Sequence, residues 1–161
     1  MVKIKYRRIL NSDKAWIDKF IENHWGSKAI AVHNTVYYPS FLKGFLAEAG
    51  KEKTGLITYN IDGKKCEIVS LNSILENKGI GTALVNLVID EAKEKNCGEI
   101  WLVTTNDNIK GLYFYQKIGF QIVHIYLNAV QQSRKLKPEI PLKAANGIPI
   151  KDELELSLKI K

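Results

Sequence analysis

The stretch with the clearest chemical potential is residues 76–84, Glu-Asn-Lys-Gly-Ile-Gly-Thr-Ala-Leu, which joins an expected strand to an expected long helix. Gly79 and Gly81 lie one residue apart, and glycines at such a junction let bare backbone N–H groups approach a ligand. The helix that follows adds its N-terminal dipole and unpaired amides, which favour a bound phosphate. The pattern therefore predicts a phosphate-binding loop.

Two familiar phosphate motifs do not match this stretch. The dinucleotide fingerprint requires a third glycine where Leu84 stands, and an acidic residue at the far end of the next strand. Glu99 is at a suitable sequence distance but begins its strand. The P-loop requires Gly-Lys-Ser/Thr at a spacing that is absent here. A tight turn into a packed helix also remains open as the reason for the two glycines.

A second motif follows the next expected strand: residues 108–120 read Asn-Ile-Lys-Gly-Leu-Tyr-Phe-Tyr-Gln-Lys-Ile-Gly-Phe. With both motifs, residues 67–120 resemble the GNAT superfamily of acetyl-CoA-dependent N-acetyltransferases. Its core is a strand, an (Arg/Gln)-x-x-Gly-x-(Gly/Ala) loop, a helix and another strand, followed by Asn-x-x-Ala-x-x-x-Tyr-x-x-x-Gly-Phe. Two positions depart from this pattern: Glu76 stands where Arg or Gln is usual, and Gly111 replaces the common Ala. We expect Glu76 to contribute backbone rather than a cationic side chain.

The resemblance implies acetyl-CoA as co-substrate and no metal. The strand near Leu71 and Ser73 would pair with the pantetheine arm like an added strand, and Asn108 would contact the same arm. Lys78 could add a positive charge beside the pyrophosphate. The residues expected to hold that pyrophosphate through backbone amides are Lys78, Gly79, Ile80, Gly81 and Thr82.

The resemblance also implies a catalytic acid. Tyr115 matches the tyrosine that in the family protonates the departing sulfur, which is chemically reasonable because a phenol of pKa about 10 can protonate a developing thiolate. Tyr113 is the fallback, and an aromatic packing role for Tyr115 remains open. The acceptor amine must lose a proton to a base, for which Glu67 is the leading candidate and His33 and Glu48 are alternatives.

The hydrophobic pattern predicts a single domain over residues 1–161, of α/β (α+β) class, with a GNAT-like mixed central sheet. An antiparallel N-terminal meander would precede the strand–helix–strand acetyl-CoA core, with flanking helices. Strands are expected at 2–9, 44–48, 55–61, 66–72, 99–105, 121–127 and 153–160, with a β-like pattern over 28–40. Helices are expected at 12–25 with Ser12 as cap, 79–95, 109–117 and 129–136, and a long loop at 137–151.

Composition narrows the function classes. The chain has 161 residues, 45% of them hydrophobic and 25% charged, with a net charge of +7. No apolar run approaches the roughly 18 residues of a membrane span, so we expect a cytoplasmic protein without a membrane partner. The basic residues are scattered rather than grouped in a nucleic-acid module, which argues against nucleic acid as partner. Cys66 and Cys97 have no neighbouring His, and structural or incidental roles are favoured.

The preferred function is therefore an N-acetyltransferase that acts on a small-molecule or peptide amine, with a lysine side chain as a further acceptor. A non-catalytic sensor of CoA or acyl-CoA on the same fold is the alternative. The sequence leaves a homodimer open.

Overall fold

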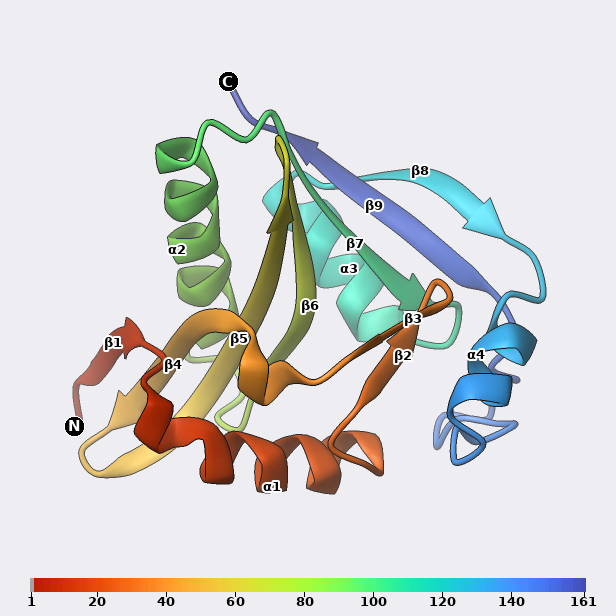
Figure 1. Ribbon diagram of the computed structural model, residues 1–161, viewed down its shortest axis with the longest axis horizontal. Helices are drawn as coiled ribbons and strands as arrows, with labels where there is room; N and C mark the ends of the chain where they lie inside the picture. The colour runs from red at the N-terminus through yellow and green to blue at the C-terminus, as the bar shows by residue number, and fades with distance from the viewer. Residues whose placement is uncertain (1) are drawn as a thin grey trace.

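In the computed structural model, which describes residues 2–161, a twisted seven-stranded sheet carries helices on both faces (Figure 1). Its strands are β1 (Ile4–Arg8), β4 (Lys43–Ala49), β5 (Glu52–Asp62), β6 (Lys65–Ser73), β7 (Glu99–Thr105), β8 (Gln121–Tyr126) and β9 (Glu153–Lys159). The helices are α1 (Lys14–Trp25), α2 (Ile80–Glu94), α3 (Ile109–Ile118) and α4 (Val130–Leu136), with 3-10 turns at Asn11–Asp13 and Pro39–Phe41. A separate hairpin joins β2 (Ile30–Val32) to β3 (Thr35–Tyr37).

The sheet is mixed, as the sequence predicts. Its order is β1-β4-β5-β6-β7-β9-β8, in which β6 and β7 run parallel and every other neighbouring pair runs antiparallel. Helix α2 makes the crossover from β6 to β7, because parallel neighbours cannot be joined by a tight turn. Strand β9 returns from the long excursion at 137–151 and inserts between β7 and β8.

Strands β6 and β7 pair over a short distance and then separate. Their register runs from Lys65 opposite Glu99 to Glu67 opposite Trp101. Within the described chain, neither strand pairs with the other beyond that point, although β6 continues to Ser73 and β7 to Thr105. The divergence opens the sheet at its centre, between the strands that carry the two predicted motifs.

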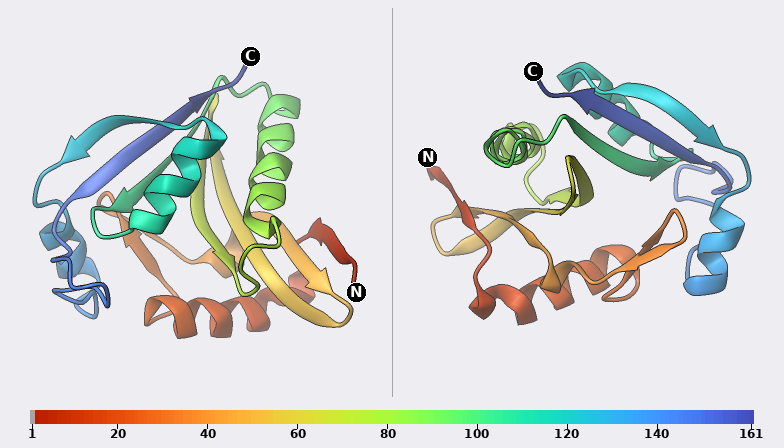
Figure 2. Two further views of the ribbon diagram at one scale, coloured as in Figure 1. Left: turned by 180° about the vertical axis from the view of Figure 1, so that it is seen from behind. Right: turned by 45° about the horizontal axis from the view of Figure 1, so that its top comes forward.

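Two hydrophobic cores fix the elements around this opening. Helices α2 and α3 cover one face of the sheet, while α1 and the β2–β3 hairpin lie against the other (Figure 2). The apolar stripe of α2, with Ile80, Leu84 and Val88 fully or almost fully buried, packs against the first face because its spacing places these side chains on one side of the helix.

Two local predictions meet different outcomes. The expectation that Ser12 caps the first helix is wrong: Ser12 lies in a 3-10 turn, and α1 begins at Lys14 after Asp13. The extended pattern at residues 28–40 is confirmed as the β2–β3 hairpin. Its turn residues, His33 and Asn34, have φ of 49° and 61°, as a two-residue hairpin turn with both central residues left-handed requires. No helix among residues 2–161 is long and apolar enough to cross a bilayer.

Candidate functional site

The predicted phosphate loop forms the start of α2. Gly79 is the N-cap of this helix and has φ of 70°, a left-handed conformation that glycine adopts at little cost. Among residues 2–161, no side chain caps the helix, and its first backbone bond is donated by the Ala83 N–H to the Gly79 carbonyl. The N–H groups of Ile80, Gly81 and Thr82 therefore have no partner within the helix and can receive anionic oxygens.

Gly81 brings the phosphate loop close to the second motif. A Cβ at this position would lie 3.2 Å from the Phe114 ring, which is tighter than an ordinary contact between the two groups. The absence of a side chain therefore lets the first turn of α2 approach the middle of α3 at Phe114. This packing requirement accounts for the second glycine, and φ accounts for the first.

A groove of about 630 Å³ runs along the phosphate loop. Its lining residues include the predicted donor contacts Leu71, Ser73, Asn108 and the loop from Lys78 to Thr82. Lys110 also lines it, and its ammonium lies 3.7 Å from the exposed Glu76 carboxylate. Lys110 of α3 thus places a positive side chain beside Glu76, which the sequence motif did not reveal.

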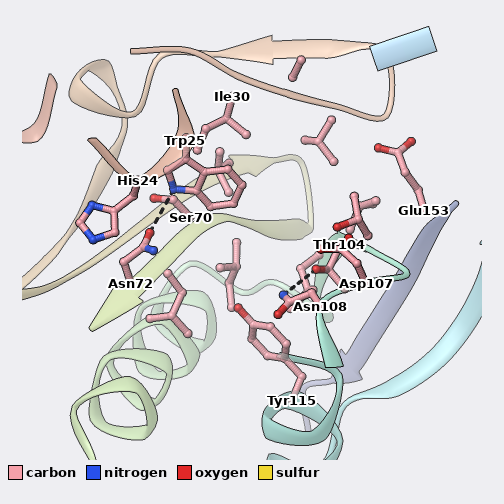
Figure 3. Close-up of a pocket in the computed structure, with 18 residues that line it drawn as sticks. His24, Trp25, Ile30, Ser70, Asn72, Thr104, Asp107, Asn108, Tyr115 and Glu153 are labelled. Carbon is pink, nitrogen blue, oxygen red and sulfur yellow. Dashed lines mark hydrogen bonds between the residues drawn. The ribbon is translucent and has the colours of Figure 1, made fainter. Parts of the chain in front are cut away.

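A second cavity, of about 390 Å³, occupies the gap between the diverging strands (Figure 3). It shares Leu71, Asn72, Asn108 and Tyr115 with the groove, so the two hollows adjoin at these four residues. We call this second hollow the central cavity. Together the two hollows extend from the phosphate loop to the point where β6 and β7 separate.

Asn108 is fixed by two hydrogen bonds. Its Oδ1 accepts the Gly111 N–H at 3.1 Å and thereby caps α3, as predicted from the sequence. Its Nδ2 donates to Thr104 Oγ1 at 2.9 Å, which ties the cap to the end of β7. The side chain is therefore held in place before any ligand arrives.

Tyr115 lies where the groove meets the central cavity. Its ring packs edge-on against Phe114 and Phe120, so the packing role and the cavity position coexist in one side chain. Its hydroxyl points towards the gap between β6 and β7, beside Asn108 (Figure 3). Burial raises the pKa of Tyr115 above its ordinary value of 10.0, so the phenol is protonated at neutral pH. Tyr113 is 66% exposed and lines neither hollow.

Comparisons with known proteins agree with this architecture. Residues 13–120 match the model of the acetyltransferase (GNAT) family. The chain belongs to this family. It is 49% identical over 146 residues to the uncharacterized protein YdhI of Bacillus subtilis, covering 89% of this chain and 91% of that protein.

Solved structures of other acetyltransferases share the fold of this protein. A Bacillus subtilis acetyltransferase in complex with CoA superposes with a TM-score of 0.68 at 22% identity, covering 100% of both chains. A GNAT family acetyltransferase from Elizabethkingia anophelis with acetyl-CoA bound gives a TM-score of 0.67 at 23% identity, covering 97% of each. The predicted α+β GNAT-like fold is confirmed, and structural neighbours of the protein bind CoA or acetyl-CoA.

The three candidate bases of the acetyltransferase lie in different places. Glu67 is 6% exposed and accepts a hydrogen bond of 2.5 Å from the Tyr37 hydroxyl, in a separate hollow of about 160 Å³ that His33 also lines. Burial raises the pKa of Glu67, although the Tyr37 hydrogen bond and nearby His33 act in the opposite direction. Glu48 instead pairs with Arg7 at 2.7 Å on β4, and lines none of these hollows.

Several features of the site have no signature in the motifs. Opposite β5, Tyr59 pairs with Ile68 and Thr58 with Ser70, so Val69 is the extra residue of a β-bulge beside the central cavity. Glu153, at the start of β9, and Asp107, in the turn before α3, also line that cavity. The alternation of β9 predicts a strand but does not say which of its faces meets another element.

The C-terminal excursion supports the cavity from outside. The Lys137 ammonium is buried and donates to the carbonyls of Trp25 at 2.5 Å and Ala29 at 3.0 Å. Burial lowers the pKa of Lys137. Trp25 lines the cavity and donates its Nε1–H to Asn72 Oδ1 at 3.2 Å (Figure 3). Lys137 therefore ties the end of α4 to the end of α1 and to the segment before β2, and the Trp25 indole links α1 to β6.

Proposed function

We propose that this acetyltransferase moves an acetyl group from acetyl-CoA to a primary amine by direct attack, without an acyl-enzyme. The observation that carries the proposal is the pair of adjoining hollows that extends from the uncapped N-terminus of α2 to Tyr115. It combines a phosphate site at one end with a protonated acid at the other. Both cysteines are buried, and burial raises the pKa of each thiol, which disfavours the thiolate that a covalent route needs.

The residues present fit the donor. The amides of residues 78–82, the predicted site residues, would hold the pyrophosphate, helped by the charges of Lys78 and Lys110. Beyond Glu67, β6 has an edge without a β7 partner in the described chain, so Leu71 and Ser73 offer backbone groups to the pantetheine amides. Asn108 would contact the same arm.

The reaction requires polarisation of the thioester carbonyl. The amine nitrogen attacks that carbon, the new C–N bond forms, and the C–S bond then breaks. The bulge at Val69 removes one backbone unit from the β5–β6 ladder, and we assign an N–H there to the carbonyl oxygen. The sulfur takes its proton from Tyr115, whose raised pKa keeps it in the acid form.

Glu67 serves in this proposal as the base that takes the amine proton. Its carboxylate lies in the hollow next to the central cavity, so it acts through water. The raised pKa suits this role because a base with a pKa nearer neutrality holds the abstracted proton more firmly. Its hydrogen bond with Tyr37 fixes the carboxylate in position.

The direct test incubates the protein with acetyl-CoA and a panel of amines and follows free thiol. We expect turnover, and Tyr115→Phe should lower kcat about a hundredfold. The matched control is Tyr113→Phe, which removes the same hydroxyl from a residue outside both hollows and should leave kcat unchanged. Full turnover by Tyr115→Phe at saturating substrates would exclude the acid role. Acetyl-CoA binding without turnover on any amine would favour the CoA sensor.

A further inference from the structure

The charge of the central cavity is opposite to that of the whole protein. The chain carries 24 Lys and Arg against 17 Asp and Glu, yet the residues that line this cavity include two carboxylates and no Lys or Arg. The adjoining groove, in contrast, is lined by Lys78 and Lys110. Cations are therefore placed where a phosphate is expected, and anions where the second substrate enters.

Glu153 is one of the two carboxylates. It is 2% exposed, and its Oε2 accepts the His33 N–H at 3.1 Å and the Ser133 hydroxyl at 3.5 Å. Among residues 2–161, no Lys or Arg forms an ion pair with it, and its Oε1 has no hydrogen-bond partner. Oε1 can therefore accept a hydrogen bond from a cationic ligand in the cavity, and charge-assisted hydrogen bonds are stronger than neutral ones.

Asp107 supplies an independent observation. Its Oδ1 is buried and has no hydrogen-bond partner in the part of the chain that the structure describes. The residue directly precedes the cap Asn108 and lines the same cavity. Buried polar atoms in proteins are nearly always paired, so this unpaired acceptor leaves negative potential behind the cavity wall that a cationic ligand would offset.

We infer that the acceptor is a small aliphatic diamine, an inference that rests on the proposed acetyl transfer and names its substrate class. Tyr115 and Glu153 lie at opposite ends of the central cavity, with Asp107 between them (Figure 3). The reacting nitrogen lies at the Tyr115 end, while the second nitrogen stays protonated and pairs with Glu153 Oε1. A volume of about 390 Å³ suits a short, flexible chain.

The proposed geometry predicts different kcat/KM values for two amines of equal length. We expect 1,4-diaminobutane to be acetylated with a kcat/KM about tenfold or more above that of butylamine, since one buried charge-assisted hydrogen bond distinguishes them. Glu153→Gln should remove most of this preference by raising KM for the diamine, with butylamine changed by less than about twofold.

Two features make the variant informative. The amide oxygen of Gln can still accept from the His33 N–H and the Ser133 hydroxyl, so the fold is retained. The matched control is Asp152→Asn, which removes one negative charge from the neighbouring residue. The Asp152 carboxylate accepts from the Asn128 N–H and does not line the cavity.

Calorimetric binding of 1,4-diaminobutane to the wild type and Glu153→Gln gives a readout that does not depend on turnover. Equal kcat/KM for the two amines, or an equal loss for both in Glu153→Gln, overturns the diamine inference while leaving acetyl transfer intact. If no amine is turned over, the proposed function fails. The diamine site then stands only if calorimetry shows binding that Glu153→Gln abolishes and Asp152→Asn keeps.

Discussion

Replacing Gly111 with alanine should destabilise the protein, although alanine is the usual residue of the family motif at this position. In a helix, alanine is favoured over glycine by about 1 kcal/mol. Here, however, a Cβ on residue 111 would lie 2.3 Å from Asn108 Nδ2 and 2.7 Å from its Cγ. The Asn108 side chain must therefore move, and it cannot move without weakening its hydrogen bonds to the Gly111 N–H and to Thr104.

The sizes of the opposing free-energy contributions decide whether Gly111→Ala stabilises or destabilises the protein. Loss of an N-cap costs about 1 kcal/mol, and loss of the bond to Thr104 costs about another 1 kcal/mol. Set against the propensity gain, Gly111→Ala should lower the free energy of unfolding by about 1 kcal/mol. In an Asn108→Ala background the clashing atoms are gone, so the same substitution should raise it by about 1 kcal/mol.

A double-mutant cycle in urea measures this difference, and we expect a coupling energy of about 2 kcal/mol between positions 108 and 111. Because Asn108 also lines the groove, Gly111→Ala should raise KM for acetyl-CoA about threefold to tenfold. If Gly111→Ala stabilises the wild type as much as it stabilises Asn108→Ala, the steric argument is refuted.

Three further predictions concern the loop, acid stability and the base. Gly79→Ala, at φ of 70°, should lower the free energy of unfolding by about 1 kcal/mol and weaken acetyl-CoA binding. The control Gly98→Ala, whose Cβ would meet no atom within 4 Å, should change neither quantity. Equal affinities of the two variants for acetyl-CoA would count against pyrophosphate binding by the loop. Arg7 holds the pKa of Asp13 at about 2 against the usual 3.8, so this stabilisation is present above pH 3.8 and lost as pH falls towards 2. Acid unfolding should show about 2 kcal/mol lost over that window in the wild type but not in Asp13→Asn. Burial raises the pKa of Glu67, so kcat/KM should rise with pH through a midpoint above the ordinary 4.5. Glu67→Gln should lack this rise and should lower kcat about a hundredfold. An unchanged pH profile in the variant would exclude Glu67 as the base.

Local sequence patterns predicted the features that depend on local structure. The start of α2 at Gly79, the cap at Asn108 and strand β7 follow from neighbouring residue types and from the hydrophobic periodicity, and each is found at the predicted position. The cap at Ser12 failed because Asp13 supplies a better anchor: its carboxylate accepts the Leu10 N–H and binds Arg7 of β1.

The features that depend on register and long-range contacts were not predictable. The bulge at Val69 exists only relative to β5, and the place of Glu153 on the cavity wall depends on β9 inserting next to β7. Asp107 looks like an ordinary turn residue until its Oδ1 is seen to lie buried without a partner among the described residues. The residues proposed to bind acetyl-CoA can thus be recognised from local sequence patterns. The residues proposed to bind the acceptor are brought together only by the topology of the sheet.

The short β6–β7 ladder also has a mechanical consequence. Three residue pairs, from Lys65–Glu99 to Glu67–Trp101, form the direct strand pairing between the N-terminal meander and the C-terminal strands. A ligand that bonds to both strands would extend this pairing. At a ligand concentration of a hundred times its Kd, the free energy of unfolding would rise by about 2.7 kcal/mol. Amide exchange in residues 69–73 should slow accordingly. The concentration of acetyl-CoA would then determine the stability of the junction between the two parts of the sheet, and with it the lifetime of the folded chain.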